Sequence, residues 1–122
     1  MTADALLDAL LEAFNARDAD AVAALMHPDG SWEETEGPPP LGRVHRGRAA
    51  VREAADRLFR LLPDGRFSDD DRFVCGDRAL LEWTYRATTP LGGELHARGC
   101  DVLTLRDGLV LRKASYLKQT RR

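Results

Sequence analysis

The hydrophobic residues in the first half of the chain recur at helical spacing in three segments. The first follows Thr2, a residue type that caps helix N-termini, and the second is a short segment that Asp18 or Asp20 could cap and that ends before Pro28. The third follows Gly47 and keeps its 3.6-residue period as far as Pro63. We therefore expect three helices, whose apolar positions are Leu6, Leu7, Leu10, Leu11 and Phe14; Val22, Leu25 and Met26; and Ala50, Val51, Ala54, Ala55, Leu58, Leu61 and Leu62.

Segments typical of β-strands make up most of the rest of the chain. Residues 31–36 alternate enough for a short strand, and the proline run at 38–40 must then be a loop, because proline lacks the backbone donor of a strand ladder. After Arg66 four runs follow, near 66–75, 78–88, 94–105 and 109–118, and short turns rich in glycine join them. This order predicts an α+β domain in which three N-terminal helices pack on one face of an antiparallel meander.

Length and composition limit the functions that this chain could have. Its 122 residues, 43% of them hydrophobic, are enough for one core, so we expect a single domain spanning residues 1–122. The 18 basic residues are scattered among 20 acidic ones, with a net charge of -2, which argues against nucleic acid as a partner. There is no run long enough to cross a membrane and no signal-peptide pattern at the start, so we expect a soluble, cytoplasmic protein. Cys75 and Cys100 lack metal-type spacing, and the sequence indicates neither a metal nor a cofactor.

An acidic residue interrupts one apolar strand face. With a two-residue period, Asp101 points the same way as Leu103 and Leu105, so it is buried if that face is the core. A buried carboxyl group needs a partner or a proton. A two-residue turn at 107–108 would place Asp101 opposite Ala114, whereas a three-residue loop at 106–108 would place it opposite Lys113.

Several short segments together resemble the nuclear-transport-factor-2-like superfamily, which includes ketosteroid isomerase, SnoaL-like polyketide cyclases and limonene epoxide hydrolase. They are Phe14-Asn-Ala-Arg-Asp18 followed by Ala23-Ala-Leu25, Gly47-Arg-Ala-Ala-Val-Arg52, Leu81-Glu-Trp-Thr84, and Gly99-Cys-Asp-Val with Arg106-Asp-Gly108. The resemblance covers nearly the whole chain. It implies a strongly curved, cone-shaped sheet (a cystatin-like α+β barrel), a pocket at the open end, and a homodimer formed through the outer sheet face.

The resemblance also implies two catalytic positions. Asp101 falls where the isomerase has the aspartate of its oxyanion hole, and Glu34 falls where it has its general base. Two departures leave both known sites incomplete: Leu10 replaces the tyrosine donor of the isomerase, and Gly99 replaces the arginine of the epoxide hydrolase. We favour the register that pairs Asp101 with Lys113, because it keeps the last strand in the parity that the family uses. Lys113 would then hold Asp101 ionised, as a base or as half of a structural ion pair.

The family parity also assigns the two faces of the 78–88 strand. It directs Glu82, Thr84 and Arg86 into the pocket and places Leu81, Trp83 and Tyr85 outside, where a second subunit would cover them. The inverted assignment would bury the two aromatic residues in the core, which is their more ordinary position. We expect the pocket to be lined by substrate-binding residues and to suit a small polar or charged ligand; these residues are Trp32, Glu82, Arg86 and Lys113.

Other charged groups carry weaker signals. Glu33, Glu34 and Glu36 could share acid and base duties or could form a solvated strand edge. The three histidines, His45 among them, lack metal-type spacing and are interpreted as solvent-facing or capping residues. The leading hypothesis is a small-molecule-binding SnoaL-like protein that transfers protons through Asp101 or Glu34 without a cofactor. The alternative is a non-catalytic ligand-binding or dimerisation module of the same fold.

Overall fold

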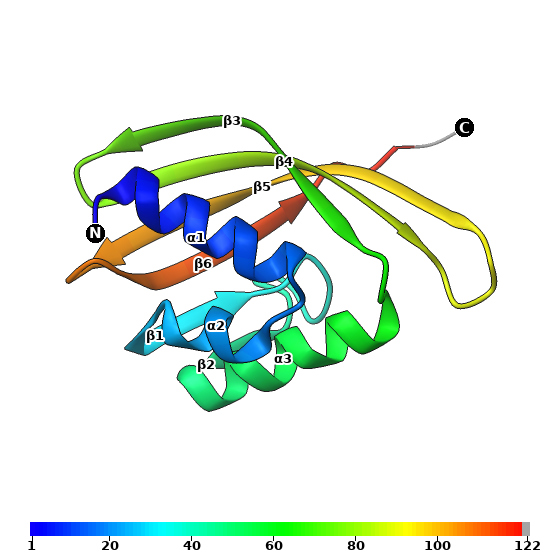
Figure 1. Cartoon of the computed structure of the whole chain (residues 1–122), viewed down its shortest axis with the longest axis horizontal. Helices are drawn as coiled ribbons and strands as arrows, with labels where there is room; N and C mark the ends of the chain where they lie inside the picture. The colour runs from blue at the N-terminus through cyan, green and yellow to red at the C-terminus, as the bar shows by residue number, and fades with distance from the viewer. Residues whose placement is uncertain (121–122) are drawn as a thin grey trace.

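The computed structural model describes residues 1–120 and places three helices against a curved sheet of six strands (Figure 1). The helices are α1 (Ala3–Asn15), α2 (Ala19–Ala24) and α3 (Arg48–Leu61). The strands are β1 (Met26–Glu33), β2 (Val44–Arg46), β3 (Arg66–Cys75), β4 (Arg78–Thr88), β5 (Glu94–Arg106) and β6 (Leu109–Leu117). The predicted α+β fold is therefore confirmed. None of the described helices is long and apolar enough to cross a membrane.

The helix ends follow from their capping residues. The Thr2 hydroxyl accepts a hydrogen bond from the backbone N–H of Ala5, as the sequence predicted. Asp18 rather than Asp20 caps α2, because its carboxylate accepts from the N–H of Ala21. The short helix ends at Ala24, earlier than predicted, and Met26 already belongs to β1.

The sheet has the strand order β2-β1-β6-β5-β4-β3. The last four strands form the predicted antiparallel meander, while β1 runs parallel to β6 and joins the two halves of the molecule. Strand β2 was not predicted, because three residues are too few to show a two-residue period. It pairs antiparallel with β1 and brings His45 opposite Trp32.

The core lies between the helices and the concave face of the sheet. Leu6, Leu7 and Leu10 of α1 are fully buried against it, together with Val51 and Ala55 of α3. Burying a leucine side chain contributes about 1.5–3 kcal/mol, so this apolar face is a major part of what holds α1 to the sheet. Figure 1 shows that the helices leave the other side of the β3–β6 meander uncovered.

Candidate functional site

Strand β4 places its aromatic residues inside the molecule. Leu81, Trp83 and Tyr85 are buried, and Leu81 pairs directly with Asp101 on β5, so these residues share the concave face. The predicted assignment of faces is therefore wrong, and the inverted one is correct. The physical reason is that this orientation removes two large aromatic side chains from water, whereas the predicted one would place them on the face that no helix covers.

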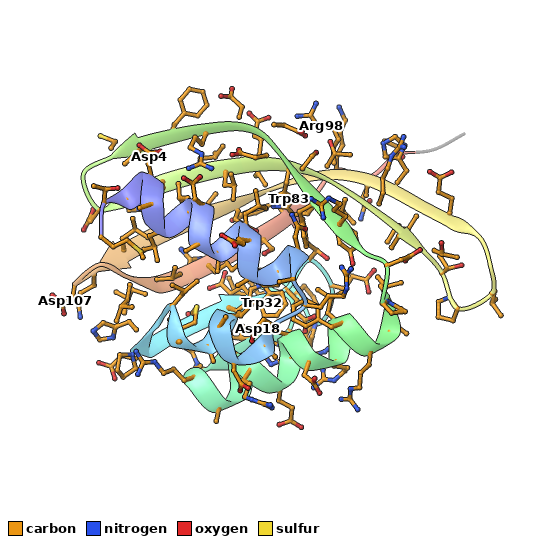
Figure 2. The ribbon with its side chains drawn as sticks, viewed as in Figure 1. Asp4, Asp18, Trp32, Trp83, Arg98 and Asp107 are labelled. Carbon is orange, nitrogen blue, oxygen red and sulfur yellow. The ribbon has the colours of Figure 1, made fainter. Side chains whose placement is uncertain are left out.

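Glu82 and Arg86 consequently lie on the outer face and do not line the pocket that was predicted for them. Glu82 lies 3.6 Å from Arg98, and the guanidinium of Arg86 lies 3.4 Å from the ring of His96. Figure 2 shows the contrast between the two faces: Trp83 lies on the helix side of the sheet, whereas Arg98 projects from the opposite side.

The register of β5 and β6 differs from both predicted registers. The turn does have two residues, because Arg106 pairs with Leu109, but the register shifts beyond Val110 and Asp101 comes to lie opposite Ser115. Lys113 pairs with Leu103 and is the diagonal neighbour of Asp101 on the same face. Its ammonium group lies 3.3 Å from the Asp101 carboxylate, so the predicted ion pair forms through a different register.

Asp101 is the centre of a buried polar network. The Ser115 hydroxyl donates to Oδ1 of Asp101 at 2.7 Å and accepts from Lys113 Nζ at 3.0 Å and from Trp32 Nε1 at 3.1 Å. A hydroxyl has one donor and two acceptor sites, so all three are used. The burial predicted for Asp101 is confirmed, with 4% of the residue exposed.

Aromatic rings enclose the ammonium group of this network. Lys113 Nζ lies 4.7 Å from the ring centroid of Trp32 and 4.9 Å from that of Phe14. Such contacts stabilise a cation electrostatically, and more so where water is excluded. A void of about 10 Å³ beside Asp101 and Lys113 has space for a single water-sized molecule and for nothing larger. The carboxylate is thus sealed.

A larger pocket of about 340 Å³ opens above this network. Its walls are mainly apolar and come from α3 and the concave face of the sheet, with Leu58, Leu62, Phe67 and Tyr85 among them. Trp32, Lys113 and Ser115 reach the same pocket, but Asp101 does not. Pockets that bind small organic molecules usually have volumes of about 300–1,000 Å³ and apolar walls with a few polar groups, which fits this one.

Glu34 is the predicted catalytic residue that reaches the pocket. It follows β1 directly, and its side chain is 23% exposed. Its Oε2 atom lies 2.6 Å from His45 Nε2 and 3.1 Å from an Arg43 guanidinium nitrogen. The backbone N–H of Glu34 donates to the carbonyl of Arg43, which continues the pairing of β1 with β2.

His45 is the functional candidate that the sequence analysis missed, because it was interpreted as solvent-facing. Only 11% of its side chain is exposed, and its ring lies 5.9 Å from that of Trp32. The alternation of Val44, His45 and Arg46 was the one available signal, and it became informative only when these residues paired with β1.

The family of this chain follows from its sequence as well as its shape. The model of the SnoaL-like domain family matches residues 7–113, which is most of the chain. The chain belongs to the SnoaL-like domain family. None of the functionally curated proteins matches it in sequence.

Solved structures of the same fold include proteins with bound small molecules. TerC, co-crystallised with polyporic acid, is 25% identical to this SnoaL-like domain; the match covers 94% of this chain and 90% of TerC, with a TM-score of 0.82. A putative polyketide cyclase from Xanthomonas campestris pv. campestris is 24% identical over 94% of this chain and 89% of that one, also at 0.82. A ketosteroid-isomerase-like protein from Catenulispora acidiphila, in complex with trimethylamine, is 16% identical with a TM-score of 0.85 and covers 94% and 86%.

Gly99 in this SnoaL-like domain makes room for Trp83. The two residues are partners across β4 and β5, and a Cβ atom at position 99 would overlap the indole ring and the carbonyl oxygen of Tyr116. The absence of an arginine at position 99 therefore has a packing cause. Trp83 is 4% exposed, and its Nε1 is the one buried side-chain polar atom within residues 1–120 that has no hydrogen-bond partner.

The described part of this SnoaL-like domain, residues 1–120, contains no group of three or more His, Cys, Asp or Glu side chains that could hold a metal ion. Cys75 and Cys100 are free thiols on the outer face of the sheet or at its edge. Burial raises the pKa of the Cys100 thiol, and the negative charges of Asp101 and Glu82 raise it further. Neither thiol lines the pocket above Asp101.

Proposed function

We propose that this SnoaL-like domain binds a largely apolar small molecule in the pocket of about 340 Å³ and that Glu34 transfers protons on it without a cofactor. The observation that supports this most is the division between the two predicted acids. Glu34 lines the pocket and is partly exposed, whereas Asp101 lies beneath it and is sealed. A general base must come within hydrogen-bond distance of the proton it removes, and of the two predicted acids Glu34 is the one that lines the pocket.

His45 and Arg43 hold the proposed base in place. Both contact the same carboxylate oxygen, Oε2, and leave Oε1 of Glu34 for a ligand. A carboxylate that removes a proton beside a carbonyl group produces an enolate, whose oxygen needs a nearby donor. Lys113 lines the same pocket, and its ammonium group has three donors, of which one goes to the Ser115 hydroxyl, while its charge is paired with Asp101.

Asp101 then acts on the ligand only through Lys113. We assign it as a positioning residue, because its carboxylate fixes the ammonium group without reaching the pocket. The ligand also differs from the polar one predicted from the sequence, since Glu82 and Arg86 lie on the outer face. An aromatic ketone or quinone with one or two oxygen acceptors suits the aromatic walls and the cationic side chains of the pocket, which are Arg43, Arg57 and Lys113. The two solved neighbours with small organic molecules support a ligand-binding role for the fold.

The second candidate function is a non-catalytic binding module. One specific observation favours it: each buried polar side chain of the network has at least one partner within it, as expected for a structural element of the pocket floor. In this case a ligand would bind, but no proton would be exchanged with it.

One experiment separates the two candidates. Aromatic ketones and hydroxyquinones are first tested for binding by thermal shift. Binders with an acidic C–H bond are then incubated with the protein in D₂O, and the loss of that proton is followed by NMR. We expect Glu34→Gln to bind the ligand but to lose at least about 100-fold in exchange rate, because general-base catalysis contributes roughly 10²–10⁴-fold. Glu36→Gln, at the rim of the same pocket, is the matched control and should exchange normally.

The possible results are distinct. Exchange that persists in the Glu34→Gln variant would refute the assignment of the base. Binding without exchange in the wild-type protein would establish the binding module instead. A failure of every compound to bind in the pocket would refute both candidates.

We further propose that the chain forms a homodimer through the outer face of the sheet. Trp83 and Tyr85 are buried and cannot form this interface, but Phe73 and Tyr116 leave 62% and 56% of their surface exposed on that side. Sedimentation equilibrium should give twice the mass of the chain for the wild-type protein and a monomer for Phe73→Asp. A monomeric wild-type protein at micromolar concentration would refute the dimer.

A further inference from the structure

Three basic side chains lie side by side on the outer face of the sheet. Arg66 on β3 pairs with Arg86 on β4, and Arg86 pairs with His96 on β5. All three are exposed. Directly opposed residues on neighbouring strands have Cβ atoms about 4.5–5.5 Å apart, and like charges in that position repel each other. The row therefore concentrates positive charge at one end of the sheet.

Two acids on β3 do not neutralise this row, because other groups already pair with them. Asp69 forms an ion pair with Arg72. Asp70 accepts hydrogen bonds from the hydroxyls of Ser68 and Thr84 and lies 3.6 Å from Arg98. Among residues 1–120, no carboxylate forms an ion pair with Arg66 or Arg86. The whole chain carries a net charge of -2, so the positive potential here is local rather than general.

The surface is hollowed at the same place. A depression of about 680 Å³ is lined by Arg66, Arg86 and His96 and includes the hydroxyl-bearing residues Ser68 and Thr84. Two guanidinium groups and an imidazole thus border one concave surface. Leu11 and Asn15 of α1 also line this depression, which therefore extends around the edge strand β3 from the outer face toward the helix side.

We propose that this row, Arg66, Arg86 and His96, binds the oxyanion group of a small molecule, a carboxylate or a sulfate- or phosphate-type group. Guanidinium groups form paired hydrogen bonds with such planar or tetrahedral oxyanions, and the bound anion cancels the repulsion between the two arginines. None of these three residues lines the pocket of Glu34, so the site does not depend on the proposed function.

Glu94 provides an internal check on the proposal. It borders the adjoining depression together with Asp64, Arg66 and Arg86 but forms no ion pair with either arginine. Its carboxylate lies near the row and repels an incoming anion. Removing its charge should therefore strengthen anion binding.

The test uses the full chain and sodium sulfate, whose charge does not change between pH 5 and pH 8. Backbone amide shifts are measured by NMR at low ionic strength during the titration, and sodium chloride at equal ionic strength is the reference. We expect saturable shifts at residues 66, 86 and 96. Arg86→Gln should raise the dissociation constant of sulfate about tenfold, because it removes a charge-assisted hydrogen-bond donor. Glu94→Gln should lower it.

Arg106→Gln is the matched control, because it removes the same charge from the opposite end of β5. The dissociation constant of sulfate from the Arg106→Gln variant should equal that from the wild-type protein. An equal loss in the Arg106 and Arg86 variants would show that only net charge matters and would overturn the site. Shifts that do not saturate, or that sodium chloride reproduces, would overturn it as well. A parallel titration with acetate shows whether the site prefers a carboxylate to a sulfate-type group.

Discussion

The buried ion pair between Asp101 and Lys113 gives the sharpest prediction about stability. Asp101→Asn removes the negative charge but keeps an oxygen that can accept from the Ser115 hydroxyl. The measured loss of stability therefore gives the cost of leaving the Lys113 ammonium group buried without a counter-charge. At the observed separation of 3.3 Å, two unit charges attract by about 5 kcal/mol with an effective dielectric constant of about 20.

Removing one partner of a buried pair generally destabilises a protein by about 3–5 kcal/mol, which agrees with that figure. A domain of 122 residues has a free energy of unfolding of about 6–18 kcal/mol, so the variant should lose a large fraction of it. The melting temperature should fall by about 10–20 °C, since 1 kcal/mol corresponds to roughly 3–5 °C at this size. Urea denaturation at pH 7, followed by circular dichroism, measures the free energy directly.

A double variant tests the cause of the loss. Lys113→Met removes the ammonium group and keeps the aliphatic volume, so combining it with Asp101→Asn should recover at least about 2 kcal/mol. The matched control is Asp56→Asn, which breaks an exposed pair with Arg60 and should cost less than about 0.5 kcal/mol. If Asp101→Asn loses no more than Asp56→Asn, or if the double variant is no more stable than the single one, the carboxylate is not what balances Lys113.

Three further outcomes follow from the packing and the hydrogen bonds of the sheet. Gly99→Ala should destabilise the protein by about 3 kcal/mol or more and alter the fluorescence of Trp83, because the added Cβ overlaps the indole ring. Trp83→Phe should cost at least about 1 kcal/mol less than Trp32→Phe in urea denaturation, because Trp83 has no hydrogen bond to lose and Trp32 does. Thr84→Val should raise the pKa of Asp70 as measured by NMR, because the Thr84 hydroxyl is the main cause of its lowered value. A lowered pKa means that Asp70 stabilises the native state above its unfolded pKa and loses this contribution as the pH falls through the folded value, so the variant should be less stable at neutral pH.

Each of these has its own control. Gly93→Ala meets only the Thr89 side chain and should fold with nearly normal stability; equal losses at positions 93 and 99 would contradict the packing argument. Equal losses from the two tryptophan variants would show that the indole N–H of Trp83 has an unseen partner. An unchanged Asp70 pKa in Thr84→Val would show that other groups, such as the Ser68 hydroxyl and the Arg98 charge, control it instead.

Local sequence patterns were enough to predict the elements and the family. Apolar residues that recur every 3.6 positions in α1 and α3 lie on one side of each helix through helix geometry alone. Their spacing therefore predicts which side is buried without knowledge of the rest of the fold. The strands of the meander were recognised in the same way from their two-residue period. The order of the elements, together with a few short segments, then indicated the SnoaL-like fold, and the family match confirms it.

The candidate site was predictable only in part. Alternation placed Trp32 with Glu34 and placed Asp101 among buried leucines, and these assignments hold. It could not decide which face of β4 looks toward the helices, because a two-residue period defines two faces without saying which is inside. Three β-strand residues at 44–46 were too few to show that His45 would reach Glu34.

The sequence by itself determined that a carboxyl group at position 101 shares a strand face with leucines and that, if buried there, it would need a partner or a proton. Only the tertiary structure decided how it is satisfied: the register shift beyond Val110 makes Ser115 its direct neighbour and leaves Lys113 on the diagonal. A bulge changes the register of every residue beyond it, and it is fixed by how the whole sheet packs rather than by the residues at the turn. The sequence could therefore predict that Asp101 pairs with Lys113, but it could not predict that Asp101 would lie beneath the pocket instead of lining it.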